Sequence, residues 1–317
     1  ALIAGQRGLT LCDGFLATPA WLGLCGDSAP LPAHLAEFDS RNNRQLYACA
    51  QQLAAEIESA KAQFGAHRVA IIIGSSTSGV AESEDFIATL DQGVAPKPNY
   101  SYQRQEMGDP ARFLAETFGI SGPAYVISTA CSSSGRALMS AKRLIAMNLA
   151  DVVICGGADS LCRLTVNGFA ALESVSDAPC APFSPNRQGI NIGEAAVLFV
   201  MSKAPSSIAA IELAGCGASS DAHHISAPQP DGLGAISAMQ AALQDASMQP
   251  SEIGYLNLHG TATKLNDAME SRAVTSVFAG IDLPVSSTKA LTGHTLGAAG
   301  ALEAAFCWLL LHNPTGE

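Results

Sequence analysis

Apolar runs alternate with amphipathic stretches along most of the chain. A continuously apolar run predicts a strand that is covered on both faces by helices, whereas apolar residues at a spacing of three to four predict a helix. In the first part of the chain we expect strands at 69–74, 125–130, 151–157 and 195–203, and helices at 43–63, 111–119 and 132–148. Because strands and helices alternate, parallel strands joined by right-handed crossovers are predicted.

A second series of strands and helices follows Lys203. Its expected strands are 208–217, 254–260 and 283–289, and its expected helices are 233–247, 266–278 and 298–311. Two series in the same order predict a duplicated α/β fold with mostly parallel central sheets, divided into residues 1–204 and 205–317. Neither half shows a closing strand in its pattern, so we expect both chain ends to be incomplete.

The amino-acid composition indicates that much of the chain is buried, in a core or in an interface. Hydrophobic residues make up 48% of the 317 and charged residues only 14%, against a usual quarter. So few charges favour a large core, an extensive interface or both, and hence a homo-oligomer.

Charge and cysteine usage exclude several classes of function. The net charge is −11 with a pI near 5.0, and no run of Lys or Arg indicates a nucleic-acid or membrane patch. The apolar runs are too short to cross a bilayer, and the first residues lack the pattern of a signal peptide. Nine cysteines without a CxxC pair argue against a zinc site or a disulfide framework and predict a reducing, cytoplasmic location.

The segment STACSSSG at 128–135 places Cys131 where a buried strand ends and a helix begins. Helix amides and the helix dipole at such a position predict a lowered thiol pKa and rapid modification by thiol reagents. The small residues that follow leave room for a substrate and free backbone amides for an oxyanion. The alternative is a buried structural cysteine beside a helix cap.

Two histidines follow predicted strands of the second half. His259 lies in LHGTATKLND, and His294 lies in STKALTGHTLGAAG after Lys289. Ligands of α/β sheets bind at the carboxyl ends of strands, so both histidines are expected at one site. Taken singly, each is compatible with a solvated loop residue and Lys289 with a surface charge. Their combination with Cys131 favours nucleophilic catalysis.

Together these stretches resemble the β-ketoacyl-acyl-carrier-protein synthases of the Cys-His-His group, in the thiolase superfamily. The resemblance covers nearly the whole chain and includes IAGQRGL, TACSSS, DVVICGGADSL, PFSPNRQGINIGEAA, GASSDAHHISAPQPDG, HGTATKLNDAMES and STKALTGHTLGAAGALEAA. It implies thiolase-like α/β/α/β/α layers and a decarboxylative Claisen condensation of a malonyl thioester with a cysteine-bound acyl group. The implied setting is fatty-acid or polyketide-type biosynthesis, with substrates on the phosphopantetheine of an acyl carrier protein and no metal or redox cofactor.

The resemblance also implies roles for individual residues. Cys131 matches the acylated nucleophile, and His259 and His294 match the hydrogen-bond donors to the carbonyl of the extender. Lys289 matches the active-site lysine of the family, and Glu303 matches the acid of its polar network.

Three further residues match supporting positions. Thr261 and Thr263 match the threonines that hold the phosphopantetheine arm. Asp267 matches the acidic residue that supports the histidine loop.

Two partners are implied, a second copy that pairs through 125–130 and an acyl carrier protein. Because such carriers are acidic like this chain, docking requires a local basic patch. The candidates are Lys97, Arg104, Arg112, Arg136 and Lys264.

Three other classes of protein are compatible with parts of the pattern. Thiolases carry a second cysteine, and type III synthases an asparagine, where His294 stands, so GHTLG at 293–297 favours the two-histidine group. A non-catalytic subunit of the chain-length-factor kind lacks the nucleophile, so Cys131 argues against it. No GxGxxG follows a first strand, which argues against a dinucleotide-binding protein.

Overall fold

The computed structural model describes residues 4–93, 100–203, 210–224 and 226–312. The strands are β1 (Leu9–Cys12), β2 (Ala20–Gly23), β3 (Val69–Gly74), β4 (Ala124–Ile127), β5 (Val152–Asp159), β6 (Ala195–Ser202), β7 (Leu256–Asn257) and β8 (Val285–Ser286). The α-helices are α1 (Arg41–Gln52), α2 (Ala54–Phe64), α3 (Val80–Asp91), α4 (Asp109–Phe118), α5 (Ser133–Ala146), α6 (Arg163–Ala171), α7 (Leu233–Ala246), α8 (Lys264–Val277), α9 (Lys289–Thr292) and α10 (Ala299–His312).

The central sheet has the strand order β4-β3-β5-β6. β3 pairs in parallel with both β4 and β5, which confirms the predicted mostly parallel sheet. β6 runs antiparallel to β5, contrary to the expectation of parallel crossovers throughout. The register explains the difference: Asp159 at the end of β5 lies opposite Ala195 at the start of β6. The chain therefore re-enters the sheet at the same edge at which β5 ends, so β6 runs antiparallel to β5.

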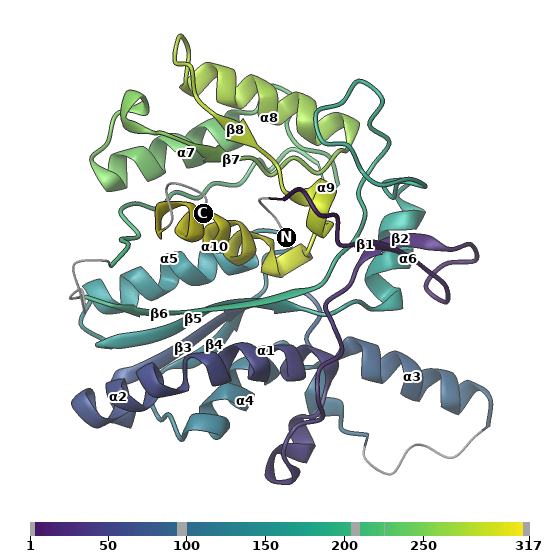
Figure 1. Cartoon of the computed structure of the whole chain (residues 1–317), viewed down its shortest axis with the longest axis vertical. Helices are drawn as coiled ribbons and strands as arrows, with labels where there is room; N and C mark the ends of the chain where they lie inside the picture. Colours follow the sequence, from purple (N-terminus) through teal and green to yellow (C-terminus); the bar gives the residue numbers. More distant parts are fainter. Residues whose placement is uncertain (1–3, 94–99, 204–209, 225, 313–317) are drawn as a thin grey trace.

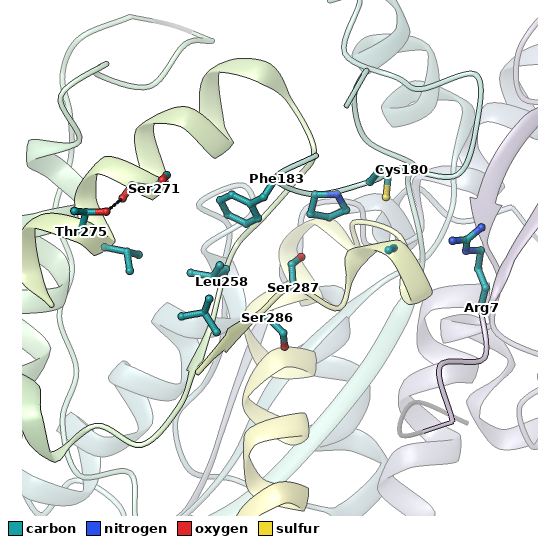
Figure 2. A pocket seen from close by; sticks show the side chains of 13 residues that line it. Arg7, Cys180, Phe183, Leu258, Ser271, Thr275, Ser286 and Ser287 are labelled. Atoms are coloured by element: carbon teal, nitrogen blue, oxygen red, sulfur yellow. Dashed lines mark hydrogen bonds between the residues drawn. The ribbon is translucent and has the colours of Figure 1, made fainter. Parts of the chain in front are cut away.

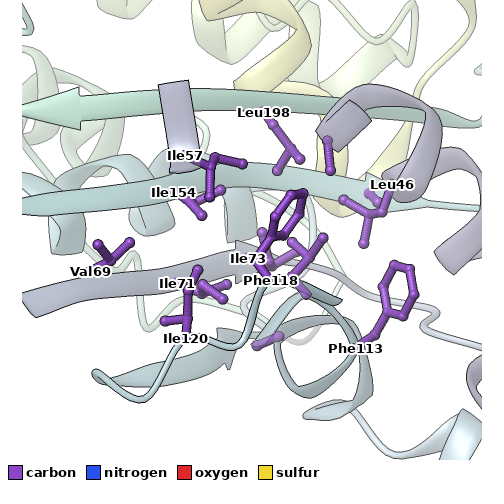
Figure 3. Packing of buried hydrophobic residues seen from close by; sticks show 14 of the residues in the cluster. Leu46, Ile57, Val69, Ile71, Ile73, Phe113, Phe118, Ile120, Ile154 and Leu198 are labelled. Atoms are coloured by element: carbon purple, nitrogen blue, oxygen red, sulfur yellow. The ribbon is translucent and has the colours of Figure 1, made fainter. Parts of the chain in front are cut away.

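Alternate residues of β3 pack into two separate cores, which is why the whole strand is apolar. Val69, Ile71 and Ile73 lie in the cluster beneath α1, α2 and α4, which Figure 3 shows. Ala70 and Ile72 lie in the cluster beneath α5. Both faces of a strand are buried in this way when helices cover both faces of a parallel sheet.

The elements form five layers (Figure 1). α1, α2 and α4 lie on one face of the central sheet, and α5 and α10 lie on the other. β7 and β8 lie beyond α10, with α7 and α8 outermost. This arrangement confirms the predicted α/β fold with its alternating helical and sheet layers. No helix in the described part of the chain is long and apolar enough to cross a membrane.

The second half departs most from its prediction. β7 and β8 are parallel but pair over only two residues each. The predicted strand 208–217 is not a strand over 210–217, and its first two residues lie outside the described part of the chain. A side chain at Gly217 would lie 1.9 Å from the backbone oxygen of Ala238, so this segment packs against α7. Its backbone therefore faces a helix, which cannot supply the ladder that a strand requires.

The helices also differ in detail from the expected ones. The predicted helix 43–63 is interrupted at Leu53, where φ and ψ are −108° and 8°, and continues as α2. α3 and α6 were not predicted, because exposed Ile87, Leu90 and Leu164 lie on their surfaces and blur the apolar stripe.

Candidate active site

Cys131 lies in a tight turn between β4 and α5, one residue before the helix cap Ser132. The backbone of Ala130 is left-handed, with φ of 52°. Ser133 Oγ accepts a hydrogen bond from Thr129 N at 2.9 Å and donates to Ala130 O at 2.5 Å. Ser132 Oγ donates to Thr129 O at 2.8 Å. The serines after Cys131 therefore hold the turn that presents the thiol.

Small residues allow three elements to contact the start of α5 through their main chains. A side chain at Gly74 on β3 would lie 2.2 Å from Ser134 N, and one at Gly157 on β5 would lie 2.6 Å from Ser134 Cβ. A side chain at Gly300 on α10 would lie 2.9 Å from Gly135 N. Ser134 Oγ also accepts a hydrogen bond from Ala301 N at 2.9 Å. Close backbone approach at these glycines, together with the Ser134 hydroxyl, thus helps to position the helix that follows Cys131.

His259 follows β7 in a loop held by two acids of α8. Glu270 accepts hydrogen bonds from His259 N at 2.6 Å and from Gly260 N at 2.8 Å. Asp267, which is buried, accepts from Ala262 N at 3.1 Å further along the same loop. Glu270 is not among the site residues expected from the sequence. Its spacing of three residues from Asp267 is the available signal, because that spacing places both acids on one face of the helix.

His294 is buried, and its imidazole contacts the thiol. Its backbone N donates to Asn191 O at 2.7 Å, and its carbonyl accepts from Gly193 N at 2.9 Å. Its Nε2 lies 2.9 Å from Cys131 Sγ. Its Nδ1 has no hydrogen-bond partner among the described residues, so neither tautomer of the ring is imposed by the protein.

The structure brings the three residues of the predicted site together. Ligand atoms of Cys131, His259 and His294 all lie within 4.8 Å of one another. The two rings meet edge to face, with centroids 5.1 Å apart and an interplanar angle of 86°. A thiol and two imidazoles at this separation could also ligate a thiophilic cation, and they form the one such group found within the described ranges.

Lys289, at the start of α9, is 2% exposed and forms an ion pair with Glu303 of α10. Thr261 is buried, and its Oγ1 lies 3.0 Å from that of Thr263, the residue before α8. Two threonine hydroxyls therefore face each other beside the histidine loop, a suitable place for polar groups of a substrate arm.

Burial decides the protonation of all three central groups. Burial, together with the nearby Lys289 cation, lowers the pKa of His259 to about 3. The pKa of His294 lies well below its usual value for the same reasons, together with the charge of His259. Both imidazoles are therefore neutral at pH 7 and can donate or accept one hydrogen bond at each nitrogen as the tautomer allows.

The thiol differs from its prediction. Burial raises the pKa of Cys131 to about 11, although Lys289 and the backbone amide of Cys131 itself lower it. The expected lowered pKa was therefore wrong, because removal of the thiol from water outweighs the helix start. The resting nucleophile is a neutral thiol whose proton lies within reach of His294 Nε2.

A pocket of about 560 Å³ lies beside Phe183, Leu258 and Ser287 (Figure 2), and Cys131 is not among the residues that line it. The ring of Phe183 on its wall would meet a side chain placed on Gly260 at 2.9 Å. Ser287 Oγ, also on its wall, donates to Gly260 O at 3.0 Å. Cys180 Sγ donates to Lys289 O at 3.3 Å. The pocket walls therefore support the active-site loops from the rear.

The basic residues expected to receive a carrier are engaged in different ways. Arg104 donates to the carbonyls of Ala36 and Glu37, and Arg112 pairs with Asp109, so both side chains support the fold. Arg136 donates to a carbonyl of another segment, and Lys264 is exposed at the start of α8. Lys97 lies outside the described residues. The common patch stays a prediction.

Comparison with known families covers almost the whole chain. Residues 32–206 match the family described as Beta-ketoacyl synthase, N-terminal domain, and residues 210–315 match Beta-ketoacyl synthase, C-terminal domain. The mitochondrial 3-oxoacyl-[acyl-carrier-protein] synthase of Arabidopsis thaliana is 38% identical over 213 residues, which are 62% of this chain and 46% of that protein. The 3-oxoacyl-[acyl-carrier-protein] synthase 2 of Staphylococcus aureus is 37% identical over 208 residues, which are 62% of this chain and 52% of that protein. The chain spans about half the length of the curated relatives it matches.

Solved structures agree with these matches. A structure described as a ketosynthase (ApeO) in complex with its chain length factor (ApeC) from Xenorhabdus doucetiae superposes with a TM-score of 0.93 at 48% identity. The match covers 98% of this chain and 78% of that chain. A beta-ketoacyl synthase from Burkholderia phymatum STM815 gives a TM-score of 0.86 at 29% identity, over 98% of this chain and 80% of that chain.

Proposed function

The chain belongs to the beta-ketoacyl synthase family, and on that premise we propose that it is a 3-oxoacyl-[acyl-carrier-protein] synthase. The proposed reaction is the decarboxylative condensation of a malonyl thioester with an acyl group held on Cys131. One observation supports it most: a thiol and two neutral imidazoles whose reactive atoms lie within 4.8 Å.

The first step is transfer of the acyl primer to Cys131. The thiol donates its proton to His294 Nε2, 2.9 Å away, as its sulfur attacks the thioester carbon. A new carbon–sulfur bond forms, the bond to the phosphopantetheine sulfur breaks, and the proton passes from the imidazole to that leaving sulfur. Because the thiol pKa is raised, the proton must move during the attack and not before it.

The second step is decarboxylation of the extender. Carbon dioxide leaves the malonyl group, and the electron pair of the broken bond becomes an enolate whose charge develops on the thioester oxygen. Two neutral imidazoles that donate N–H to that oxygen stabilise the charge where it forms. His294 can serve in both steps because its tautomer is not fixed by a partner on Nδ1.

Condensation then completes the cycle. The enolate carbon attacks the acyl group on Cys131, a carbon–carbon bond forms, and the bond to the cysteine sulfur breaks. The thiolate takes a proton from water, and the 3-oxoacyl product stays on its carrier. The residues present supply this chemistry through covalent and hydrogen-bond catalysis.

The test separates the two half-reactions. In His259→Ala we expect malonyl decarboxylation to fall roughly 10²–10³-fold while acyl transfer to Cys131 survives. In His294→Ala we expect both to fall, because that ring also contacts the thiol. Decarboxylation can be followed by release of labelled carbon dioxide and acyl transfer by intact-protein mass spectrometry. Wild-type decarboxylation in the His259→Ala protein would refute the proposed function.

We further propose that an acyl carrier protein delivers the substrates and that the chain pairs through the edge strand β4. β4 has one neighbour in the sheet, and its residues Ala124–Ile127 are exposed or half-buried. An edge strand with free backbone groups supports continuation of the sheet into a partner. A second copy is the proposed partner, and the related ketosynthase named above was solved with a chain length factor. Native mass spectrometry of the chain alone that showed only monomer would count against the homodimer.

The proposed location is the cytoplasm. Its support is the set of nine cysteines without a CxxC pair, all of which are free thiols in the structure.

A further inference from the structure

Asp159, the last residue of β5, is a fully buried carboxylate that accepts bonds from two loops. Its Oδ1 accepts four hydrogen bonds from the loop that follows β3. The donors are Ser75 Oγ at 2.8 Å, Ser76 N at 2.7 Å, Thr77 N at 2.9 Å and Thr77 Oγ1 at 2.9 Å. Oδ1 is thereby fully committed to this loop.

The other oxygen of Asp159 contacts the turn that follows His294. Gly297 N donates to Oδ2 at 2.5 Å, three residues after the histidine. A side chain at Gly297 would lie 2.7 Å from Oδ2 and 2.6 Å from Ser76 Oγ. The turn therefore rests directly on the carboxylate, with no space between them.

The loop on the first oxygen leads in turn to the nucleophile. Ser76 Oγ donates to the carbonyl of Ala130, the residue before Cys131, at 3.3 Å. One carboxylate thus lies between the turn that presents the thiol and the turn that follows the histidine. The two turns are 163 residues apart in the sequence when counted from Cys131 to His294.

A carboxylate is a costly residue at such a place. Asp159 forms no ion pair with any Lys or Arg of the described ranges, so its charge is balanced by hydrogen-bond donors alone. Burial raises its pKa, and the donors lower it. A buried charge without a cation destabilises a fold unless its hydrogen bonds compensate, and an apolar residue fills space at lower cost.

We infer that Asp159 is a positioning residue that sets the place of His294 relative to Cys131. It acts through the Gly297 amide on one oxygen and the Ser75–Thr77 loop on the other, and touches neither substrate nor the reacting atoms. The inference rests on the proposed function, because it concerns the geometry of decarboxylation.

Asp159→Asn tests this role with a change of one atom. If the amide oxygen takes the place of Oδ1, its NH₂ group faces the N–H of Gly297, and two donors oppose each other. The Gly297 bond is then lost while the four bonds to the other loop remain. We expect kcat for malonyl decarboxylation to fall roughly 10- to 100-fold, as for a displacement of about 1 Å in a catalytic group. KM for the carrier-bound extender should not change, because Asp267 and Glu270 hold the histidine and threonine loop independently.

Asp109→Asn is the matched control. Asp109 is another buried carboxylate, which accepts from Asn43 Nδ2 and Arg112 Nη2 at 2.7 Å each and contacts no residue of the site. This variant should lose stability but keep the decarboxylation rate per folded molecule. If Asp159→Asn matches it in both respects, Asp159 serves only the fold and the inference is overturned.

Two further measurements keep the inference testable in every case. Gly297→Ala disrupts the contact between Gly297 and Asp159 Oδ2 from the side of the turn, and it serves as the test if Asp159→Asn does not fold. It should lower kcat in the same way. A wild-type kcat in this variant overturns the inference. A crystal structure of either variant should show His294 Nε2 further than 2.9 Å from Cys131 Sγ. An unchanged separation overturns the inference. Absence of decarboxylation in the wild-type protein refutes the proposed function instead, and the crystallographic test of the inference still applies.

Discussion

The protonation state of Cys131 can be decided by a pH titration of its alkylation. The thiol pKa of about 11 lies two units above the ordinary value of 9.0, because burial disfavours the thiolate. At pH 7.5 the thiolate fraction is then on the order of 3 × 10⁻⁴, roughly 100-fold below that of an ordinary thiol. We expect the rate of iodoacetamide alkylation to rise about tenfold per pH unit and to level off only near pH 11.

Mass spectrometry of the peptide that contains Cys131 isolates this thiol from the other eight. Cys131→Ser reports the background from those cysteines. Lys289→Met should shift the profile to still higher pH, because the Lys289 cation lowers the thiol pKa. A rate that levels off below pH 8 in the wild-type protein would refute the reasoning and restore the thiolate expected at a helix start.

Three other outcomes follow from the site. Lys289→Met leaves the Glu303 carboxylate without its cation, so we expect the free energy of unfolding, measured in urea, to fall by about 3–5 kcal/mol. The double variant Lys289→Met/Glu303→Leu should recover most of this loss. Equal losses in both variants would contradict the prediction. In Glu270→Gln an NH₂ group faces one backbone N–H of the histidine loop, so one hydrogen bond is lost. Decarboxylation should fall roughly tenfold while acyl transfer is retained. An equal loss of both activities argues for a general structural role. The pKa values of His259 and His294 are depressed below 6.5, so their contribution to stability is present above pH 6.5. The free energy of unfolding should fall by roughly 1.4 kcal/mol per pH unit for each histidine as pH falls toward 3. The double variant His259→Asn/His294→Asn should flatten this part of the pH profile of unfolding.

The sequence predicts the buried strands and the central triad well, for a common reason. A strand buried on both faces is apolar at every position, as in Val69–Gly74, and local sequence alone reveals it. Cys131 follows β4, His259 follows β7, and His294 follows β8 and the short helix α9, so the rule that ligands bind at strand ends groups them. The break at Leu53 is different, because no Gly or Pro marks it in the sequence.

What the sequence does not reveal depends on distant partners. The run 208–217 is apolar enough for a strand, but its described part lies against α7. The pKa of Cys131 depends on how much water the whole fold excludes, which a local helix start does not indicate. Asp159 ends a strand as an ordinary polar residue would, and its role depends on Ser75 and Gly297, which only the folded chain brings to it.

The glycine contacts around α5 have a consequence for which positions can be substituted. Gly74, Gly157 and Gly300 lie so close to the first turn of α5 that a Cβ at any of the three would lie within 2.9 Å of its atoms. A saturation library should therefore show almost no tolerated replacement at these three positions. Under the proposed function, any change of acyl specificity is then expected to arise from substitutions at other positions.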